Sequence, residues 1–248
     1  MDQVICVIPA RYASTRLPGK PLADIGGRPM IEWVYRRAEK ARRTREVLVA
    51  TDDERVFRAV EAFGGRVVMT LERCRNGTER VAEALQGRSC DLVLNLQGDE
   101  PLIEPEALDQ LVEVFQQEPE TSMATLVRRM GEGEDPENPN VVKAVLDVKG
   151  RALYFSRHSI PYHRDRSSAR PVYYHHYGLY AFRPETLDRF VRLPDSPLER
   201  AEKLEQLRAL EHGISIRAVE TTFSMMGVDT AEDLESVRRL VEANQLTP

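Results

Sequence analysis

Short apolar runs alternate with amphipathic stretches through the first hundred residues of the chain. β-branched and aliphatic side chains fill the runs, which lie at residues 4–8, 46–50, 67–69 and 91–96. Between the runs, apolar residues recur every three or four positions, the spacing of one face of a helix. Strands that alternate with helices in this way predict βαβ units and an α/β fold with a mainly parallel, doubly wound sheet.

The amphipathic stretches carry recognisable helix limits. Apolar positions such as Ile31, Val34 and Ala38 repeat at helical spacing, and a glycine pair at 64–65 supplies a common helix stop. Helices are therefore expected at residues 29–41, from 51–53 to the glycine pair, at 78–85 and at 105–115.

The regular alternation loosens after residue 102. Strand-like stretches follow at residues 122–128, 141–147, 151–155 and 174–182, separated by polar loops. This pattern predicts a β-rich insertion at roughly residues 120–183 that packs against the α/β core. Two helices, 197–211 and 230–243, are expected to flank a last strand at 214–219. No repeat or linker divides the chain, so we expect a single domain spanning residues 1–248.

The composition is that of an ordinary globular protein. Of 248 residues, 42% are hydrophobic and 30% are charged, and this length can bury one substantial core. No apolar run approaches the roughly 20 residues of a membrane span, and the N-terminus lacks the pattern of a signal peptide. The three cysteines, Cys6, Cys74 and Cys90, form no CxxC pair. We therefore expect a cytoplasmic protein without a membrane span.

The net charge of −5 hides a basic N-terminal block, because residues 1–45 hold ten Lys and Arg against four Asp and Glu. Such a block can bind nucleic acid. Most of these cations fall at residues 36–45, where a predicted helix ends and positive charge favours the helix dipole. No aromatic interleaving or nucleic-acid motif accompanies them. A solvated helix end is the preferred interpretation, and no nucleic-acid partner is expected.

The first predicted strand ends in a loop that carries three cations, Arg11, Arg16 and Lys20, in the sequence PARYASTRLPGKPL. Cations and the backbone N–H groups of small residues suit a triphosphate. The loop is not a Walker motif, because Ser14 stands where the first glycine belongs and Pro21 follows Gly19-Lys20. A phosphate site that is not a P-loop is the favoured hypothesis, and three solvated surface charges are the alternative.

Two acidic motifs could face that loop. NLQGDEP follows the fourth predicted strand, at the strand end where open α/β sheets bind ligands. Asp99 in this motif is placed to hold Mg²⁺ between the protein and phosphates, or simply to cap a turn. Asp229 precedes the last helix, where it or Thr230 could be the N-cap with Glu232 or Asp233 as capping partner. A carboxylate there can serve both a metal and a cap.

The strand at 174–182 contains two adjacent histidines, His175 and His176. Neighbours in a strand point to opposite faces, so the pair cannot chelate one ion together, and zinc is not expected. Alternation instead groups His176, Gly178 and Tyr180 on one face. A ring donor, a gap and a phenol suit a polyhydroxylated ligand.

The predicted helix at 197–211 opens with a capping box of Ser196 and Glu199. Glu205 and Gln206 lie off its expected apolar stripe, and spacing alone leaves open whether they are solvated or line a pocket. The members of that stripe are Leu198, Ala201, Leu204 and Leu207.

Two arginines are ambiguous by themselves. Arg157, in YFSR, could pair bidentately with a substrate carboxylate. Arg80 lies in the first turn of the predicted helix at 78–85, where a structural role is the default.

Taken together and in order, these motifs resemble one family. IPARYASTRLPGKPL, ATDDERV, NGTERVAEAL, NLQGDEPLI, NPNVVKAVLD, YFSR, HYGLYAF, LEQLR and GVDTAEDLE extend from about residue 4 to 241. They are similar to the 3-deoxy-manno-octulosonate cytidylyltransferases, also called CMP-Kdo synthetases. Other sugar nucleotidyltransferases share the opening loop more loosely, whereas YFSR, LEQLR and the strand bearing His176 narrow the resemblance to this family.

The resemblance implies a Rossmann-like nucleotidyltransferase fold and a Mg²⁺-dependent reaction. CTP and Kdo (3-deoxy-D-manno-octulosonate) would be the substrates, and CMP-Kdo for lipopolysaccharide biosynthesis and pyrophosphate would be the products. The anomeric hydroxyl of Kdo would attack the α-phosphorus of CTP. The β-rich insertion would close on the sugar and contribute to a homodimer.

The resemblance also implies roles for individual residues. Lys20, Asp99 and Asp229 would be catalytic, with the two aspartates ligating Mg²⁺, and Arg157 and Lys20 are candidates for the sugar carboxylate. The residues implied for the CTP phosphates are Arg11, Ser14, Arg16 and Lys20. Those implied for the rest of CTP are Ala10, Asn76, Gly77, Arg80 and Gln97. Those implied for the sugar are Gln97, Arg157, His176, Tyr180, Glu205 and Gln206.

Two positions depart from the family pattern. Asn76 stands where the family usually has Ser, and His158-Ser159 replaces a Ser- or Ala-Pro pair close to the sugar side. An 8-amino variant of Kdo or another ulosonic acid therefore remains an alternative substrate. Two further alternatives stay open, a transferase for another nucleotide or sugar and a non-catalytic RNA-binding protein.

Overall fold

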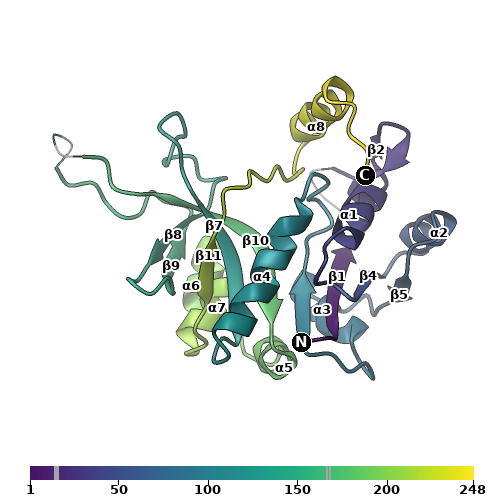
Figure 1. Ribbon diagram of the computed structural model, residues 1–248, viewed down its shortest axis with the longest axis horizontal. Coiled ribbons are helices and arrows are strands. Elements are labelled where there is room, and N and C mark those ends of the chain that lie inside the picture. The colour runs from purple at the N-terminus through teal and green to yellow at the C-terminus, as the bar shows by residue number, and fades with distance from the viewer. Residues whose placement is uncertain (14–16, 166, 168) are drawn as a thin grey trace.

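The computed structural model describes residues 1–13, 17–165, 167 and 169–248 of the chain. Two of the residues predicted to bind phosphate, Ser14 and Arg16, lie outside the described residues. Figure 1 shows one large twisted sheet with helices on both of its faces.

The strands of the central sheet lie in the order β5-β4-β1-β6-β10-β7-β11. Strand β1 is parallel to both β4 and β6, and β5 continues the parallel set. Strand β10 is antiparallel to its neighbours β6 and β7, and β11 is again parallel to β7. The prediction of a mainly parallel α/β sheet is confirmed. The bounds are β1 (Val4–Ala10), β4 (Glu46–Thr51), β5 (Val67–Met69), β6 (Leu92–Asn95), β7 (Met123–Arg129), β10 (Tyr174–Phe182) and β11 (Arg217–Glu220).

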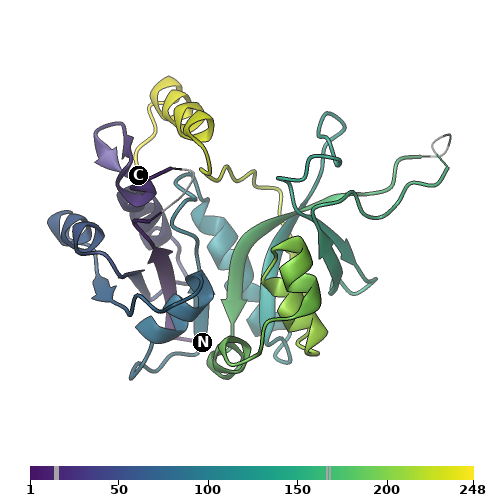
Figure 2. The same ribbon diagram turned by 180° about the vertical axis from the view of Figure 1, so that it is seen from behind.

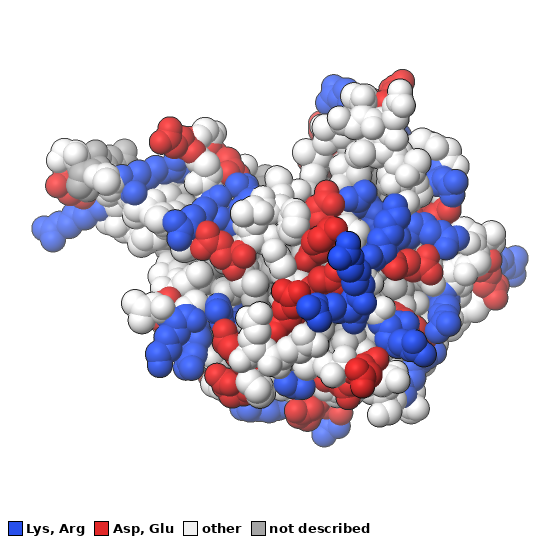
Figure 3. All heavy atoms as spheres, viewed as in Figure 1, with Lys and Arg blue, Asp and Glu red and all other residues white. Residues whose placement is uncertain are grey.

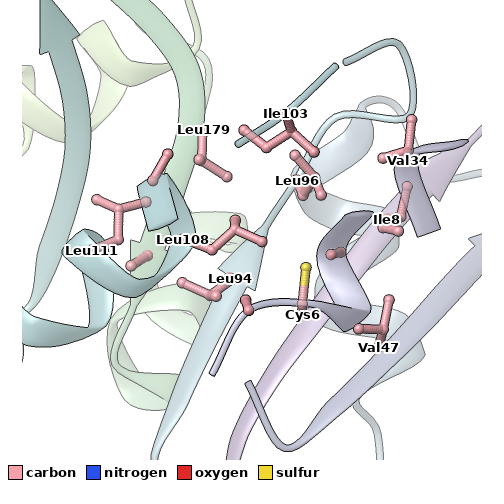
Figure 4. Packing of buried hydrophobic residues seen from close by; sticks show 14 of the residues in the cluster. Cys6, Ile8, Val34, Val47, Leu94, Leu96, Ile103, Leu108, Leu111 and Leu179 are labelled. Carbon is pink, nitrogen blue, oxygen red and sulfur yellow. The ribbon is translucent and has the colours of Figure 1, made fainter. Parts of the chain in front are cut away.

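Two layers of helices cover this sheet because side chains of each central strand alternate between its faces. In β1, Cys6 and Ile8 pack on one face with α1 (Met30–Glu39), α2 (Glu54–Ala62) and α4 (Pro105–Gln117). Figure 4 shows part of this layer, where Cys6 lies near Leu94 and Ile8 lies near Val34. The alternate residues Ile5 and Val7 face α3 (Gly77–Ala84), α5 (Pro184–Val191) and α7 (Gln206–Glu211).

The last helix, α8 (Ala231–Ala243), packs apart from the main sheet. Leu234, Val237 and Val241 contact Trp33 of α1 and the small hairpin of β2 (Asp24–Ile25) and β3 (Arg28–Pro29). To reach this place, the chain after β11 crosses from one half of the molecule to the other, as Figure 1 shows. This crossing brings Val228 against the loop after β6, where its N–H donates to the carbonyl of Asp99.

The segment predicted as an insertion, residues 120–183, begins and ends inside the central sheet, because β7 and β10 are two of its strands. What extends from it is an antiparallel pair, β8 (Lys143–Leu146) and β9 (Ala152–Ser156), joined to the sheet through β8 and β10. In Figure 2 the described residues between β9 and β10 project away from the sheet. Whether this part serves in sugar binding or dimerisation stays a prediction.

The predicted helix at 197–211 is wrong as a single element. It consists of α6 (Pro197–Glu202) and α7, separated by Lys203, which adopts a left-handed conformation with φ of 56°. As a result Leu198 and Ala201 are exposed, whereas Leu204 and Leu207 are buried. Helix α5 was not predicted. None of the described helices is long and apolar enough to cross a membrane.

Candidate active site

Lys20 is the centre of the candidate site. Its Nζ donates to Asp99 Oδ2 at 2.6 Å and to Asp229 Oδ1 at 3.2 Å. It also donates to the carbonyl of Val228 at 2.9 Å. These groups come from three distant parts of the chain: the short 3₁₀-helix η1 (Lys20–Leu22), the loop after β6 and the crossing before α8. The structure therefore brings together all three residues predicted to be catalytic.

Local backbone features hold this constellation in place. Gly19 adopts φ of 69°, which lets the chain turn into η1 just before Lys20. The N–H of Val228 donates to the carbonyl of Asp99 at 2.8 Å, so the two acidic segments are fixed to each other by backbone. A Cβ on Gly98 would lie 2.9 Å from the carbonyl oxygen of Pro9, so only glycine allows this close approach beside Asp99.

Burial and the neighbouring charges shift two pKa values at this centre. Burial lowers the pKa of Lys20, but Asp99 and Asp229 outweigh burial, and the pKa lies above its ordinary value. Lys20 is therefore a cation at any physiological pH. Burial raises the pKa of neighbouring Glu100 to about 8, assisted by the two aspartates, and its Oε2 is buried without a partner among the described residues. One ammonium thus faces two aspartates beside a mainly protonated glutamate.

Thr230 settles the question of the helix cap. Its side chain accepts from the N–H of Asp233 at 3.2 Å, and the Asp233 carboxylate accepts from the N–H of Thr230 at 2.9 Å. This is a capping box, and its members are Thr230 and Asp233, not Glu232. The Asp229 side chain is therefore not needed as the N-cap of α8.

Two cavities border Lys20 and the aspartates. The smaller, of about 360 Å³, is lined by Lys20, Asp99 and the end of β1. The larger, of about 840 Å³, is lined by Asp229, the β10 strand and the start of α7. In Figure 3 the surface is hollowed between α8 and the projecting chain beyond β9, on the side where these cavities lie. The predicted catalytic centre lies where the two cavities approach each other.

The cavities sort the predicted residues into two groups. The smaller cavity contains residues predicted for CTP, namely Ala10, Arg11, Lys20, Asn76, Gly77 and Gln97. The larger contains residues predicted for the sugar, namely Arg157, His176, Tyr180 and Gln206. A further cavity of about 700 Å³ between α3 and α5 is lined by none of the predicted site residues, so we do not include it in the site.

Arg80 lines neither cavity. Its side chain is fully buried, and its guanidinium donates to Asp52 Oδ2 at 2.5 Å and to Thr70 Oγ1. This pairing is the structural role that its place in the first turn of α3 suggested. Direct contact between Arg80 and a base is not supported by this geometry.

Asn76 and Gly77 shape the wall of the smaller cavity. Asn76 Oδ1 accepts from the N–H of Glu79 at 2.9 Å, which makes it the N-cap of α3. Since Ser and Asn are both strong N-caps, the departure from the family pattern preserves this local structure. A Cβ on Gly77 would lie 3.2 Å from Pro9 and 3.5 Å from Gln97 Oε1, so a side chain here would crowd the cavity.

Arg11 and Arg157 are each tied to backbone. Arg11 donates to the carbonyl of Cys74, while its Nε is buried without a partner in the part of the chain that the structure describes. Arg157 Nε donates to the carbonyl of Glu202 at 2.9 Å, and Nη1 donates to that of Pro139 at 3.0 Å. Both guanidinium groups are thus oriented at the edge of a cavity.

His176 is a neutral, packed side chain. Burial lowers its pKa to about 3, and its ring lies 4.7 Å from that of Phe155 and 5.6 Å from that of Tyr180 between centroids. Its Nε2 lies 3.0 Å from Thr125 Oγ1. The Thr125 hydroxyl also faces the carbonyl of Leu179 at 2.9 Å, so it can donate there and accept from the histidine ring.

A bulge between Tyr177 and Tyr180 disturbs the simple alternation of β10. His176, Gly178 and Tyr180 all line the larger cavity, as predicted, but His175 and Tyr177 line it as well. The period of two could not reveal this because a bulge adds a residue to one strand.

Glu205 and Gln206 differ in their surroundings. Gln206 is 3% exposed and lines the larger cavity. Glu205 does not line it, and its Oε1 instead accepts from Thr78 Oγ1 at 2.5 Å. Spacing alone does not distinguish a solvent-exposed position from one in a pocket wall for either residue. Of the two, Gln206 lies in the wall of the larger cavity.

Comparison with known proteins agrees with this division of the site. A protein-family model described as Cytidylyltransferase matches residues 5–216. A 3-deoxy-manno-octulosonate cytidylyltransferase of Geobacter sulfurreducens is 48% identical over 243 residues, which cover 94% of this chain and 97% of the relative. That of Myxococcus xanthus is 51% identical over 243 residues, 97% of each chain.

The chain belongs to the 3-deoxy-manno-octulosonate cytidylyltransferase family. It is therefore a nucleotidyltransferase, and the resemblance carried by its motifs is confirmed. A solved structure of CMP:2-keto-3-deoxy-manno-octonic acid synthetase complexed with CTP is 45% identical to it. The two superpose with a TM-score of 0.92 over 98% of this chain and 100% of the other.

The fold extends beyond this family. A solved 4-diphosphocytidyl-2C-methyl-D-erythritol synthase from Anaerococcus prevotii has a TM-score of 0.63 at 13% identity and covers 98% of this chain and 100% of its own. At that identity the likeness shows only a common fold. The α/β nucleotidyltransferase architecture predicted from the sequence is thus confirmed.

Proposed function

We propose that this enzyme transfers CMP from CTP to the anomeric hydroxyl of Kdo and releases pyrophosphate. The observation that carries the proposal is the contact of Lys20 with both Asp99 and Asp229, at 2.6 Å and 3.2 Å, between two cavities. Residues predicted for CTP line one cavity, and residues predicted for the sugar line the other. The family relationship supports the same reaction.

The smaller cavity is the proposed nucleotide site. Lys20 and Arg11 would face the triphosphate, and the backbone at Ala10, Asn76 and Gly77 would border the cytosine. These residues line one continuous surface at the end of β1 and the start of α3. Ser14 and Arg16 remain predicted phosphate ligands outside the described residues.

The larger cavity is the proposed sugar site. Arg157 would pair with the sugar carboxylate, since a guanidinium is suited to bidentate recognition of that group. Neutral His176 and Tyr180 would offer a ring nitrogen and a phenol to hydroxyl groups, and Gln206 would add an amide. Glu205 would act from behind this wall, because its carboxylate is occupied by Thr78.

Mg²⁺ is proposed at Asp99 and Asp229. The described residues contain no group of three or more His, Cys, Asp or Glu that could hold a metal by themselves. Two carboxylates nevertheless suit Mg²⁺, which proteins commonly bind through one or two carboxylates and substrate phosphates. Lys20 pairs with both carboxylates, so the two aspartates lie side by side at this point. When bound, the ion would supply charge neutralisation at the phosphates.

The protein's own contribution to the reaction is positioning and fixed positive charge. The sugar hydroxyl loses its proton to solvent and forms a bond to the α-phosphorus, while the bond to the pyrophosphate oxygen breaks in line and pyrophosphate leaves with the electron pair. Lys20 donates all three of its N–H groups to protein acceptors, so it would act on the phosphate oxygens as a fixed positive charge. Arg157 and the β10 strand would orient the sugar from the opposite cavity.

His158 does not favour an altered sugar. It is exposed, it does not line the larger cavity, and its N–H donates to Ser156 Oγ at 3.0 Å. The departure from the family pattern at this position therefore lies beside the sugar wall rather than in it. Kdo is accordingly preferred over its 8-amino variant.

A homodimer remains part of the proposal. Tyr162 and Val172, in the projecting chain between β9 and β10, are 78% and 49% exposed. Apolar side chains on a projecting segment are suited to contact with a second copy. We place the reaction in the cytoplasm because CTP is found there, and product formation there would serve lipopolysaccharide biosynthesis.

A pyrophosphate-release assay tests the function. Release from CTP should require both Kdo and Mg²⁺ and should stop on chelation of the metal. An enzyme that releases no pyrophosphate with any 3-deoxy-ulosonic acid would refute the proposal.

A further inference from the structure

A buried chain of hydrogen bonds runs from the smaller cavity to the base of α7. Gln97 Nε2 donates to Asn95 Oδ1 at 3.2 Å, and Asn95 Nδ2 donates to Thr78 Oγ1 at 3.1 Å. Thr78 Oγ1 in turn donates to Glu205 Oε1 at 2.5 Å. Thr78 and Asn95 in the middle are fully buried, and neither lines a cavity.

The chemistry of these groups gives the chain one direction. When Glu205 is ionised its carboxylate only accepts, so Thr78 donates its single proton to Glu205. The Thr78 oxygen then accepts from the amide nitrogen of Asn95, which turns the Asn95 carbonyl toward Gln97. Every group therefore has a defined orientation, and a change at one end alters the partner available at the next.

At the nucleotide end, the chain fixes the amide of Gln97. Its nitrogen is directed toward Asn95, and its Oε1 lies 3.5 Å from the position of a Cβ on Gly77. Both Gln97 and Gly77 line the smaller cavity. The carbonyl of Gln97 is thus presented beside the proposed nucleotide site as an acceptor.

At the sugar end, the chain fixes the start of α7. Glu205 is the N-cap residue of this six-residue helix and directly precedes Gln206, which lines the larger cavity. Helix α6 ends before Glu205, because Lys203 adopts a left-handed conformation. Glu205 is therefore not held in place by a continuous helix. Burial raises the pKa of Glu205, which makes its hydrogen bond from Thr78 the more important for keeping the carboxylate ionised.

We infer that Thr78 and Asn95 are positioning residues that couple the two substrate cavities. They hold the amide of Gln97 and the carboxylate of Glu205 in mutually dependent positions, so the nucleotide site and the sugar site are ordered together. This inference rests on the proposed function, because it assigns a ligand to each cavity.

A double-mutant cycle tests the coupling. Gln97→Ala and Glu205→Gln alter opposite ends of the chain, and two side chains separate them. The affinity for CTP alone is measured by calorimetry, and the KM for Kdo by pyrophosphate release. If the ends are coupled, the double variant should deviate from the product of the single effects by roughly 3-fold or more.

Changes at the middle of the chain give the second half of the test. Thr78→Val removes the hydroxyl at similar volume and should weaken CTP affinity and raise the KM for Kdo together. In the Thr78→Val background, the effects of Gln97→Ala and Glu205→Gln on CTP affinity and on the KM for Kdo should become multiplicative. Thr78→Ser restores the hydroxyl and should recover both constants. Thr186→Val, which alters another buried threonine on α5 away from both cavities, is the matched control and should change neither.

The outcomes separate the inference from the function on which it rests. Multiplicative single effects in the wild-type background overturn the coupling, even if Thr78→Val does not fold. Failure of Thr78→Ser to recover the two constants would also count against it. If neither Gln97→Ala nor Glu205→Gln changes CTP affinity or the KM for Kdo, the assignment of the cavities is wrong instead.

Discussion

Lys20 joins parts of the chain that are about 80 and 210 positions away from it, at Asp99 and Asp229. Its ammonium donates to three acceptors. The two carboxylates stabilise its positive charge, and the carbonyl of Val228 fixes its orientation. A cation so placed offers a fixed positive charge to the phosphates of a nucleotide, and a direct hydrogen bond to them requires one of its three bonds to open. The two aspartates, in turn, supply carboxylate oxygens, which are ligands that Mg²⁺ prefers.

Asp99→Asn should lower metal-dependent turnover by several orders of magnitude, because it removes a charge on which both Lys20 and the proposed Mg²⁺ depend. Steady-state rates at several Mg²⁺ concentrations measure the effect. Glu104→Gln, which changes an acid in the same loop that pairs with Arg37, is the control and should retain its rate. Wild-type turnover in Asp99→Asn would refute the assignment of this ligand.

Asp229→Asn should lose activity in the same way while keeping nearly all of its stability. Thr230, not Asp229, supplies the side-chain cap of α8. By contrast, Thr230→Ala should destabilise the protein by about 1 kcal/mol. Urea unfolding of the two variants provides the comparison, and a larger loss for Asp229→Asn would show that the cap has been misassigned.

Lys20→Met should strengthen Mg²⁺ binding to the enzyme without substrates, although it abolishes turnover. The substitution leaves Asp99 and Asp229 without their shared cation, which raises the attraction for a divalent ion. Calorimetric titration with Mg²⁺ measures this affinity independently of catalysis. Weaker binding than in the wild type would contradict a metal site at these carboxylates.

At the scale of elements, the break between α6 and α7 determines which faces of the protein Glu205 and Gln206 occupy. Lys203 occupies the left-handed region at φ of 56°, where a residue with a Cβ is strained. The break turns the chain so that Leu204 and Leu207 become buried while Leu198 stays at the surface. A continuous helix would place these residues on other faces.

Lys203→Gly should stabilise the protein by roughly 0.5–1 kcal/mol, because relief of the left-handed strain exceeds the entropy cost of glycine. Lys203→Val should destabilise it by about 1–2 kcal/mol and should raise the KM for Kdo, since a β-branched residue resists this conformation. Urea unfolding and the KM measure the two effects. Equal stabilities for the glycine and valine variants would contradict the role of this residue.

Local patterns account for what could be predicted of the elements. The apolar runs of β1, β4 and β6 and the glycine stop after α2 depend on neighbouring residues, so the sequence displays them directly. The break at Lys203 has no such signal, because lysine rarely adopts a left-handed conformation. Helix α5 did carry one, since Pro184 stands at its first turn with Glu185 beside it, and this start could have been recognised.

The residues of the site also fall into those that a local pattern predicts and those that only tertiary contacts place. Arg11, Lys20 and Asp99 follow strands and could be placed at one edge of the sheet from the chain order alone. The position of Asp229 depends on the crossing before α8. The hydrogen-bond chain through Thr78 depends on the place of α3 beside the end of β6, where Asn95 donates to Thr78. Arg80 shows the opposite case, because a motif residue proved to be buried against Asp52. Tertiary contacts decide such positions, and no local pattern records them.

At the scale of the molecule, the basic N-terminal block is largely neutralised. Arg37 pairs with Glu104, the N-cap residue of α4, at 3.0 Å. Arg43 pairs with Glu113 within α4 at 2.8 Å. Figure 3 shows Lys and Arg side chains beside Asp and Glu over this face. Such a mixed surface favours the solvated helix end over an RNA-binding surface.

His176 is buried and His175 is half-buried, so we expect the stability of the whole fold to fall in acid. Burial lowers the pKa of His175 to about 4 and that of His176 to about 3, from 6.5. Below 6.5 the unfolded chain therefore binds more protons than the native protein, and the free energy of unfolding falls as the pH falls. For His176 alone, the loss near pH 5 amounts to about 2 kcal/mol.

Urea unfolding at neutral pH and near pH 5 measures this dependence. His176→Gln should reduce the difference between the two pH values, and His158→Gln, at an exposed position, should leave it unchanged. The same pH dependence in His176→Gln as in the wild type would contradict a buried neutral His176.

The central claim is that two neighbouring cavities select CTP and Kdo and join them across Lys20, Asp99 and Asp229. Mass spectrometry of the product tests it most directly, with CTP, UTP and GTP offered together to the enzyme with Mg²⁺, Kdo, 8-amino Kdo and sialic acid. The structure predicts that CMP-Kdo is the dominant product. A conjugate of another nucleotide or another sugar in greater amount, or no conjugate at all, would contradict the account.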